Sequence, residues 1–206
     1  SDGDGVADAS DFAPTDSNIQ VESTASTGEF SLSSMSGLTL WLDGSDASTI
    51  DKDGSNVISE WRDKSTYENH FSSFIGDVSY VENGIGNNSG VFFDGSSQLD
   101  SAKSRFDGAG DTYAMYMVLR PASDASIWDN IILTDQEGST NILDFVFRYD
   151  KYSVRTRDGS GMHQLYSASS DISKGNVQIV SMERVSATDL TLFVNGASVE
   201  SKTIDQ

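Results

Sequence analysis

Residues 37–65 read GLTLWLDGSDASTIDKDGSNVISEWRDKS, and their pattern recurs through most of the chain. Two short runs rich in apolar residues, Leu38–Leu42 and Val57–Trp61, are separated by a region of Asp, Gly, Ser and Asn. Apolar runs of about five residues between turn-forming clusters are typical of β-strands. The stretch therefore predicts two strands connected by turns, with one short helical turn at Asp46–Thr49.

The same pattern continues towards the C-terminus. In residues 190–194 every second position is aliphatic, as in an antiparallel strand with one inward face. The pair Asn195-Gly196 that follows predicts a tight hairpin, because both turn positions tolerate positive φ. The further strand-like runs are Val91–Phe93, Tyr113–Leu119, Ile142–Arg148, Ser153–Thr156, Val177–Arg184 and Leu190–Val194. About eight strands at this spacing predict an all-β, two-sheet antiparallel sandwich.

Several motifs of this region occur together in one known family. They are Leu40-Trp41-Leu42-Asp43, Asp46-Ala47-Ser48, Asp53-Gly54, Trp61-x-Asp63-x-Ser65, Val91-Phe92-Phe93-Asp94-Gly95, Tyr113–Pro121 and LTLFVNG at 190–196. In combination they resemble the laminin-G-like, concanavalin A-like jelly rolls of bacterial secreted proteins. The resemblance implies a jelly roll over residues 37–206. Independently of the family, we interpret Trp41, Trp61, Phe92 and Phe93 as core residues rather than a sugar-stacking platform.

Members of this family usually continue past the Asn-Gly hairpin into further strands, whereas this chain ends at Gln206. We therefore expect the jelly roll to lack its closing strands or to close differently. An unpaired sheet edge invites pairing with another chain, and the segment 19–36 is a candidate donor strand for a neighbouring molecule.

The N-terminal run SDGDGVADASDFAPTDSN, residues 1–18, predicts a calcium loop. It fits the template D-x-D-x-D-G-x-x-x-x-x-D/E from the third ligand position onward, including the glycine that permits the sharp turn. The ligands that this alignment predicts are the carboxylates of Asp2, Asp4, Asp8 and Asp11 and the backbone carbonyl of Val6. Because the first ligand position falls before residue 1, we expect weak or shared binding.

Residues 2–16 also resemble the end of a thrombospondin type 3 repeat, a calcium-bound unit rich in Asp. They depart from it by lacking the upstream Asp and by carrying Ala13 before Pro14. The resemblance implies a secreted or cell-surface protein with further repeats or another domain upstream. Residues 19–36, which are rich in Ser and Thr, predict a flexible linker or weak edge strands.

The charge and composition exclude several classes of partner. The chain carries 13 basic and 32 acidic residues, a net charge of −19, which repels nucleic acid and anionic lipid. No apolar run is long enough to insert into a membrane. The chain lacks cysteine and has only two histidines, so calcium, which prefers oxygen ligands, is the metal that we expect. A high content of acidic residues can also serve solubility alone. Only the spacing of particular Asp residues separates calcium binding from solubility as the explanation.

A second group of carboxylates lies in the turns of residues 43–63. It consists of Asp43, Asp46, Asp51, Asp53 and Asp63, and it is a candidate second calcium site. Aspartates also cap turns through side-chain hydrogen bonds, and both interpretations remain open for this group.

The sequence lacks the patterns of enzymes built on this scaffold. Retaining glycanases need two carboxylates about 5 Å apart, commonly as E-x-D-x-E on one strand, and no such triple occurs. Polysaccharide lyases pair Tyr and His with a neutralising Arg or Gln. The residues that supply these types are Arg155, Arg157, His163, Gln164 and Tyr166, but their spacing does not follow known lyase motifs. We therefore predict a protein without catalytic activity.

Two functional hypotheses lead, and a polysaccharide-degrading enzyme is kept as a third. The first is a calcium-dependent extracellular binding or adhesion module that recognises a glycan or a protein through polar loops at one rim of the sandwich. The second is a structural subunit of an extracellular filament or matrix, assembled by strand exchange and calcium.

Overall fold

The computed structural model describes residues 32–101, 112–123, 129–134, 142–147, 150–158, 161–186 and 189–203. The chain divides into two units, Ser1–Leu38 and Thr39–Gln206. In the first unit the described residues form one turn of 3₁₀ helix, η1 (Leu32–Ser34). The predicted calcium loop and most of the predicted linker lie outside the described residues.

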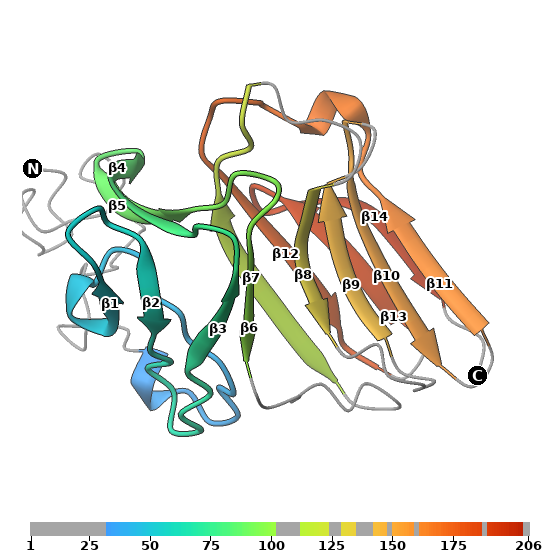
Figure 1. Cartoon of the computed structure of the whole chain (residues 1–206). Helices are drawn as coiled ribbons and strands as arrows, with labels where there is room; N and C mark the ends of the chain where they lie inside the picture. Colours follow the sequence, from blue (N-terminus) through green and yellow to red (C-terminus); the bar gives the residue numbers. More distant parts are fainter. Residues whose placement is uncertain are drawn as a thin grey trace, which may run out of the picture. The chain divides into compact units, whose positions relative to one another are not determined.

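The described strands form three four-stranded antiparallel sheets and one hairpin (Figure 1). The first sheet, in the order β1-β2-β3-β6, comprises Ile50–Lys52, Ile58–Trp61, Phe71–Ile75 and Gln98–Ser101. The front sheet, β11-β10-β9-β8, comprises Gly161–Tyr166, Tyr152–Asp158, Ile142–Phe147 and Asp129–Thr134. The back sheet, β14-β13-β12-β7, comprises Ala197–Thr203, Asp189–Val194, Gln178–Arg184 and Tyr113–Leu119. The hairpin pairs β4 (Ser79–Ile85) with β5 (Asn88–Phe92), and two further 3₁₀ turns are η2 (Ala47–Thr49) and η3 (Ser169–Asp171).

The front and back sheets pack face to face around one core (Figure 1). Its buried side chains are Met115, Phe145, Phe147, Tyr152, Val154, Leu165, Val180, Met182, Leu190, Leu192 and Val194. They alternate along each strand, as expected when one face of each sheet is turned inward. This arrangement is an all-β antiparallel sandwich and confirms the predicted fold class.

The chain leaves the back sheet after β7, forms the four strands of the front sheet, and returns at β12, which pairs with β7. Strands β11 and β14 stand at the same side of the sandwich and contact each other. There the backbone amide of Tyr166 on β11 donates a hydrogen bond to the carboxylate of Glu200 on β14. An amide of an edge strand is thus occupied by a charged side chain, which disfavours pairing with another chain at this point.

The strands β1 to β6 build a second, smaller core. Its buried members are Ile50, Ile58, Val78 and Tyr80, against which Trp61, Phe74 and Val91 pack. The sequence does not predict this third sheet and hairpin, which the described residues carry in addition to the two packed sheets of the sandwich. Register shifts interrupt the pairings β1–β2, β3–β6 and β4–β5.

Local predictions had mixed outcomes. The Asn195-Gly196 hairpin is confirmed, with φ of 51° and 79° at these residues and Val194 paired with Ala197. The turn at Asp46–Thr49 is confirmed as η2, with Asp46 as its N-cap. The strand predicted at Leu38–Leu42 is wrong. Instead of joining a sheet ladder, Trp41 donates its amide to the Asp63 carboxylate at 2.8 Å and accepts from the Lys64 amide at 2.9 Å.

Candidate functional site

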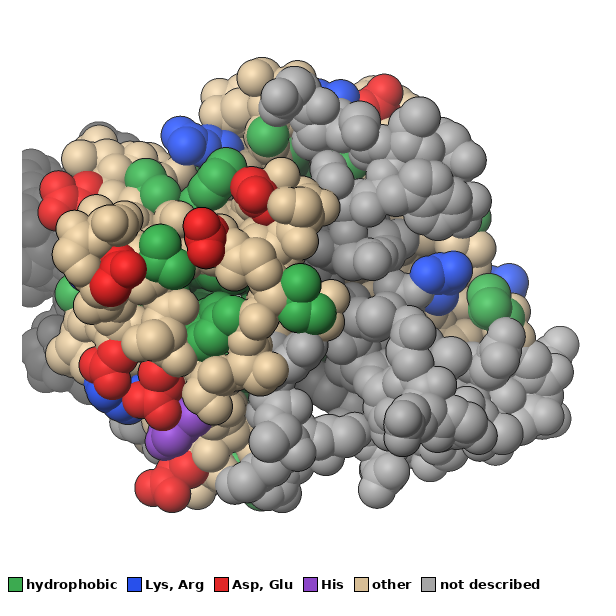
Figure 2. All heavy atoms as spheres, viewed as in Figure 1, with side chains coloured by type: hydrophobic (Ala, Val, Ile, Leu, Met, Phe, Trp, Pro, Cys, Tyr) green, Lys and Arg blue, Asp and Glu red, His purple; other side chains and the backbone are tan. Residues whose placement is uncertain are grey.

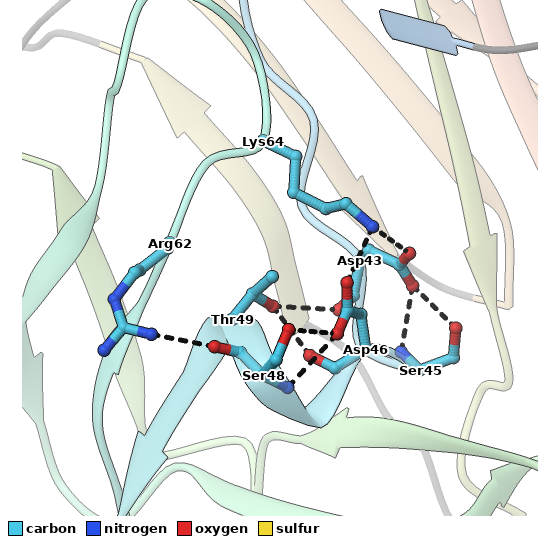
Figure 3. Close-up of polar contacts among 7 residues, drawn as sticks. All are labelled: Asp43, Ser45, Asp46, Ser48, Thr49, Arg62 and Lys64. Atoms are coloured by element: carbon cyan, nitrogen blue, oxygen red, sulfur yellow. Dashed lines mark hydrogen bonds and ion pairs between the residues drawn. The ribbon is translucent and has the colours of Figure 1, made fainter.

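Lys64 lies between two of the carboxylates predicted for the second calcium site (Figure 3). Its Nζ donates to Asp43 Oδ2 at 3.0 Å and to Asp46 Oδ2 at 2.8 Å. The same ammonium group lies 4.4 Å from the centroid of the Trp41 ring, within the range of a cation–π contact. A lysine ammonium therefore already provides the positive charge between this pair of carboxylates.

The two aspartates are oriented by the turns that contain them. Asp43 accepts from the Ser45 amide at 3.1 Å and from Ser45 Oγ at 2.7 Å. Asp46 accepts from the Ser48 amide at 3.1 Å and from Ser48 Oγ at 2.6 Å, which caps η2. In each case an Asp–x–Ser spacing supplies two local donors to Oδ1, which leaves Oδ2 to accept from Lys64.

The hydrogen bonds keep both carboxyl groups ionised. Those from Lys64 and Ser48 lower the pKa of Asp46 to about 2. Burial raises the pKa of Asp43, but hydrogen bonds from Ser45 and Lys64 outweigh this effect and lower it overall. The hydrogen bond to Asp46 in turn raises the pKa of Lys64. At neutral pH the cluster thus consists of one cation and two anions.

Arg62 holds the adjacent strand β2 and loop together. Its guanidinium donates to the Ser48 carbonyl at 2.8 Å and to the carboxylate of Asp51, and its Nε lies 3.1 Å from Glu60 Oε2 (Figure 3 shows the contact with Ser48). The hydrogen bond with Asp51 raises the pKa of Arg62. Asp51 is therefore committed to an ion pair rather than directed towards Asp43 and Asp46.

Asp63 is a buried anchor between two loops. Its Oδ1 accepts from the amides of Trp41 and Ser65, each at 2.8 Å, and its Oδ2 accepts from Ser65 Oγ at 2.6 Å and the Asn69 amide at 2.9 Å. Burial raises its pKa, but hydrogen bonds from Ser65, Trp41 and Asn69 outweigh this effect and lower it overall. Both oxygens of this carboxylate are thus engaged within the protein.

The fifth predicted ligand, Asp53, caps a separate turn. Its Oδ1 accepts from the amides of Ser55 at 2.8 Å and Val57 at 2.9 Å, next to Asn56 with its φ of 65°. Among the described residues no three His, Asp or Glu side chains gather where they could hold a metal ion. Calcium takes six to eight oxygen ligands, and a second calcium site formed by these aspartates stays a prediction. The N-terminal candidates Asp2, Asp4, Val6, Asp8 and Asp11 lie outside the described residues.

The residues considered for a lyase are divided between two faces of the front sheet. His163 pairs with Thr156, and it shares the inward face of β11 with the buried Leu165. Gln164 and Tyr166 occupy the alternate positions and point outward, where Gln164 Nε2 donates to Ser153 Oγ at 2.8 Å. The structure therefore does not bring His163 together with Tyr166.

The outer face of the back sheet carries an apolar group that the sequence analysis did not single out. Tyr116 and Val118 on β7 are 64% and 58% exposed, and Ile179 on β12 is 50% exposed. Phe193 on β13 is partly exposed beside them. We call these four residues the outer patch. A signal was present in the sequence, because the run Tyr113–Leu119 is almost continuously apolar and therefore apolar on both faces.

Strand register places the outer patch in two adjoining rows. Tyr116 stands opposite Ser181, and Ser181 stands opposite Phe193, whereas Val118 is paired with Ile179. Ser181 occupies the position between the two aromatic residues and is 6% exposed. The outer patch is therefore a continuous surface across β7, β12 and β13.

Other exposed apolar residues are more dispersed. Figure 2 shows one face of the molecule, where hydrophobic side chains lie among acidic ones over the first sheet and the β4–β5 hairpin. The exposed large residues there are Ile75, Phe92 and Phe93, so the interpretation of Phe92 and Phe93 as core residues is wrong. Single exposed apolar side chains are normal on protein surfaces, so the contiguous outer patch is the stronger candidate for a binding surface.

Comparisons with known proteins agree with the fold. No protein-family model and no curated protein matches the chain. Among solved structures, it is similar to the crystal structure of the binding domain of Paraclostridial Mosquitocidal Protein 1, with a TM-score of 0.53 and 15% sequence identity. The match covers 74% of this chain and 39% of that chain, so this chain spans about two-fifths of that structure. At this identity the likeness shows the fold alone. Among the described residues, no helix is long and apolar enough to span a membrane.

Proposed function

We propose that this chain is a non-catalytic, extracellular binding module that recognises a glycan or a protein through the outer patch. The observation that carries the proposal is the contiguous exposure of Tyr116, Val118 and Ile179 on a regular sheet. Exposed apolar surface on a folded domain costs solubility, and a contiguous patch of it marks interaction sites. The solved structure with a similar fold is described as a binding domain, which is consistent with this role.

The contacts of residues 41–69 support different roles for the two halves of the sandwich unit: the first stabilises its loops, and the second carries the binding surface. Asp43, Asp46, Asp51 and Asp63 are engaged by Lys64, Arg62 and backbone amides, so their charges serve to hold loops in place. The outer patch makes no comparable contribution to a core. Its side chains are therefore available to a partner.

Calcium dependence forms a second part of the proposal and concerns the N-terminal loop. We propose that Asp2, Asp4, Val6, Asp8 and Asp11 bind calcium, as their spacing and the resemblance to a thrombospondin type 3 repeat imply. Binding to the folded state alone would raise the melting temperature as calcium increases. Thermal melting with added calcium and with a chelator tests this, and a midpoint that does not move would contradict it.

The outer patch is tested with a matched pair of substitutions. Ile179→Ser removes an apolar residue of the patch that is 50% exposed, and Ile75→Ser removes one on the first sheet that is 56% exposed. Both proteins and the wild type are applied to printed arrays of glycans and of extracellular proteins. We expect Ile179→Ser alone to lose binding. Equal binding by all three proteins would show that the outer patch is not the contact surface.

A further inference from the structure

We infer that the outer patch binds an extended, uncharged oligosaccharide chain, laid across strands β7, β12 and β13. The inference rests on the proposed binding function and assigns its ligand. It is drawn from the size of the patch, its lack of charge, the spacing of its two rings and the hydroxyl groups beside them.

The patch is small for a stable protein interface. The three strands of the patch present a footprint of about 14 Å across the strands by about 17 Å along five residues, or roughly 240 Å². Stable protein–protein complexes bury about 800 Å² per partner. A ligand that is narrow and lies flat on the sheet matches the area available, whereas a second copy of this chain would need contacts well beyond it.

The net negative charge of the chain also restricts the classes of ligand that can bind. The chain has a net charge of −19, so it repels anionic polymers and other copies of itself. Within the patch the four side chains are uncharged, and the neighbouring Glu183 accepts a hydrogen bond of 2.6 Å from the Tyr116 hydroxyl. The described residues of the patch therefore offer no cationic group for sulfated or carboxylated glycans and favour a neutral chain.

Tyr116 and Phe193 are spaced for two contacts along one ligand. Each stands opposite Ser181, so their backbones are two strand spacings apart, about 10 Å. Ser181 between them is too small to rise above the rings. An extended chain of pyranose rings can thus lay one apolar ring face on Tyr116 and another on Phe193, with an intervening unit over Ser181.

Polar groups lie on one side of the row formed by Tyr116, Ser181 and Phe193, and aliphatic groups lie on the other side. The next row along the strands contains Glu183 and Thr191, and Thr191 Oγ1 lies 3.0 Å from Ser201 Oγ on β14. The row on the opposite side contains Val118 and Ile179. Sugars combine apolar ring faces with hydroxyl edges, and such a ligand would direct its hydroxyl groups to Glu183, Thr191 and Ser201.

The position of the Tyr116 ring is set before any ligand arrives. Its hydroxyl reaches Glu183, which is paired with Ala114 rather than with Tyr116 itself. The hydrogen bond therefore directs the ring diagonally along the sheet while most of the side chain stays exposed. Such preorganisation reduces the conformational entropy that binding would otherwise cost.

The test measures the affinity of the whole chain for soluble hexasaccharides by calorimetry. The neutral probes are the β-1,4-linked hexamers of glucose, mannose, xylose and N-acetylglucosamine, and the anionic probe is hexagalacturonate. We expect at least one neutral hexamer to bind and hexagalacturonate not to bind. Tyr116→Ala and Phe193→Ala should each weaken binding about tenfold or more. Tyr116→Phe keeps the ring and should retain most of the affinity.

Val185→Ser is the matched control, because Val185 is 66% exposed and lies outside the patch. It should leave affinity within about twofold of the wild type. Tyr116 is itself mostly exposed, so its replacement should leave the melting temperature unchanged and report on binding alone.

Three results would overturn the inference. One is binding of hexagalacturonate in preference to every neutral hexamer. Another is binding of a neutral hexamer that Tyr116→Ala and Phe193→Ala leave intact. The third is no glycan binding by the wild type. If an extracellular protein then binds and Tyr116→Ala abolishes that binding, the proposed function stands without the glycan. If the wild type binds neither class, both proposals fail.

Discussion

Replacing Asp63 by Asn tests how the loops around residues 41–69 are held. Each oxygen of the buried Asp63 carboxylate accepts two hydrogen bonds. In Asp63→Asn one oxygen remains an acceptor for the amides of Trp41 and Ser65. The other becomes an NH₂ group that faces the Asn69 amide, so two donors meet in a buried position.

The expected cost follows from these contacts. A hydrogen bond to a charged group contributes about 1.5–3 kcal/mol, and leaving a buried donor unsatisfied costs about 1–3 kcal/mol. Because Ser65 Oγ can rotate to accept from the new amide, we expect a total loss of about 2–4 kcal/mol in the free energy of unfolding. With a urea m-value of about 2 kcal/mol/M, the unfolding midpoint should fall by about 1–2 M.

Asp53→Asn is the control for this measurement. Asp53 accepts both of its backbone hydrogen bonds through a single oxygen, Oδ1, which an asparagine retains. Its urea midpoint should therefore stay close to that of the wild type. If Asp63→Asn unfolds at the wild-type midpoint as well, the four-acceptor role of Asp63 is wrong.

Four further predictions concern pH, charge, core and turn. The pKa values of Asp43, Asp46 and Asp63 are lowered in the folded state, so their stabilisation is complete above the ordinary value of 3.8 and is lost as pH falls towards 2. Circular dichroism during acid titration should detect unfolding in that range, and a stability that declines instead between about pH 5 and 8 would contradict this. Lys64→Met removes the shared cation, so the pKa values of Asp43 and Asp46 should rise and the acid midpoint should move to higher pH; an unmoved midpoint would mean that the cluster does not stabilise the fold. Leu192→Ala, at a fully buried core position, should cost about 2–5 kcal/mol in urea unfolding, and a cost below 1 kcal/mol would show that this core relaxes. Asn195→Val places a β-branched residue at a φ of 51° and should cost about 1–3 kcal/mol, whereas Asn195→Gly should cost less; the reverse order would contradict the turn assignment.

The sandwich itself could be predicted because its signals are local. The run 190–194 alternates aliphatic residues and is followed by Asn195-Gly196, and the structure has a strand and a tight hairpin there. The strands β3 and β11 were not predicted, since their sequences FSSFI and GMHQLY are partly polar and carry no clear alternation. Pairing with neighbouring strands makes them extended.

In the candidate sites, too, local contacts could be predicted from the sequence and long-range contacts could not. Asp–x–Ser spacing is enough to predict that Asp43 and Asp46 receive local donors, but nothing in the sequence indicates that Lys64, 21 and 18 residues away, inserts between them. The outer patch likewise depends on which strands become neighbours. Tyr116 and Glu183 are 67 residues apart along the chain and meet only because β7 pairs with β12 in one register.

Fold class, strand periodicity and turn chemistry therefore follow from residues that are close in the chain, where steric preference and alternation act directly. Strand partnership, register and the ion pairs of Lys64 with Asp43 and Asp46 belong to the tertiary structure. They depend on long-range pairings, and a shift of one residue in register would turn Tyr116 and Phe193 away from the surface they share.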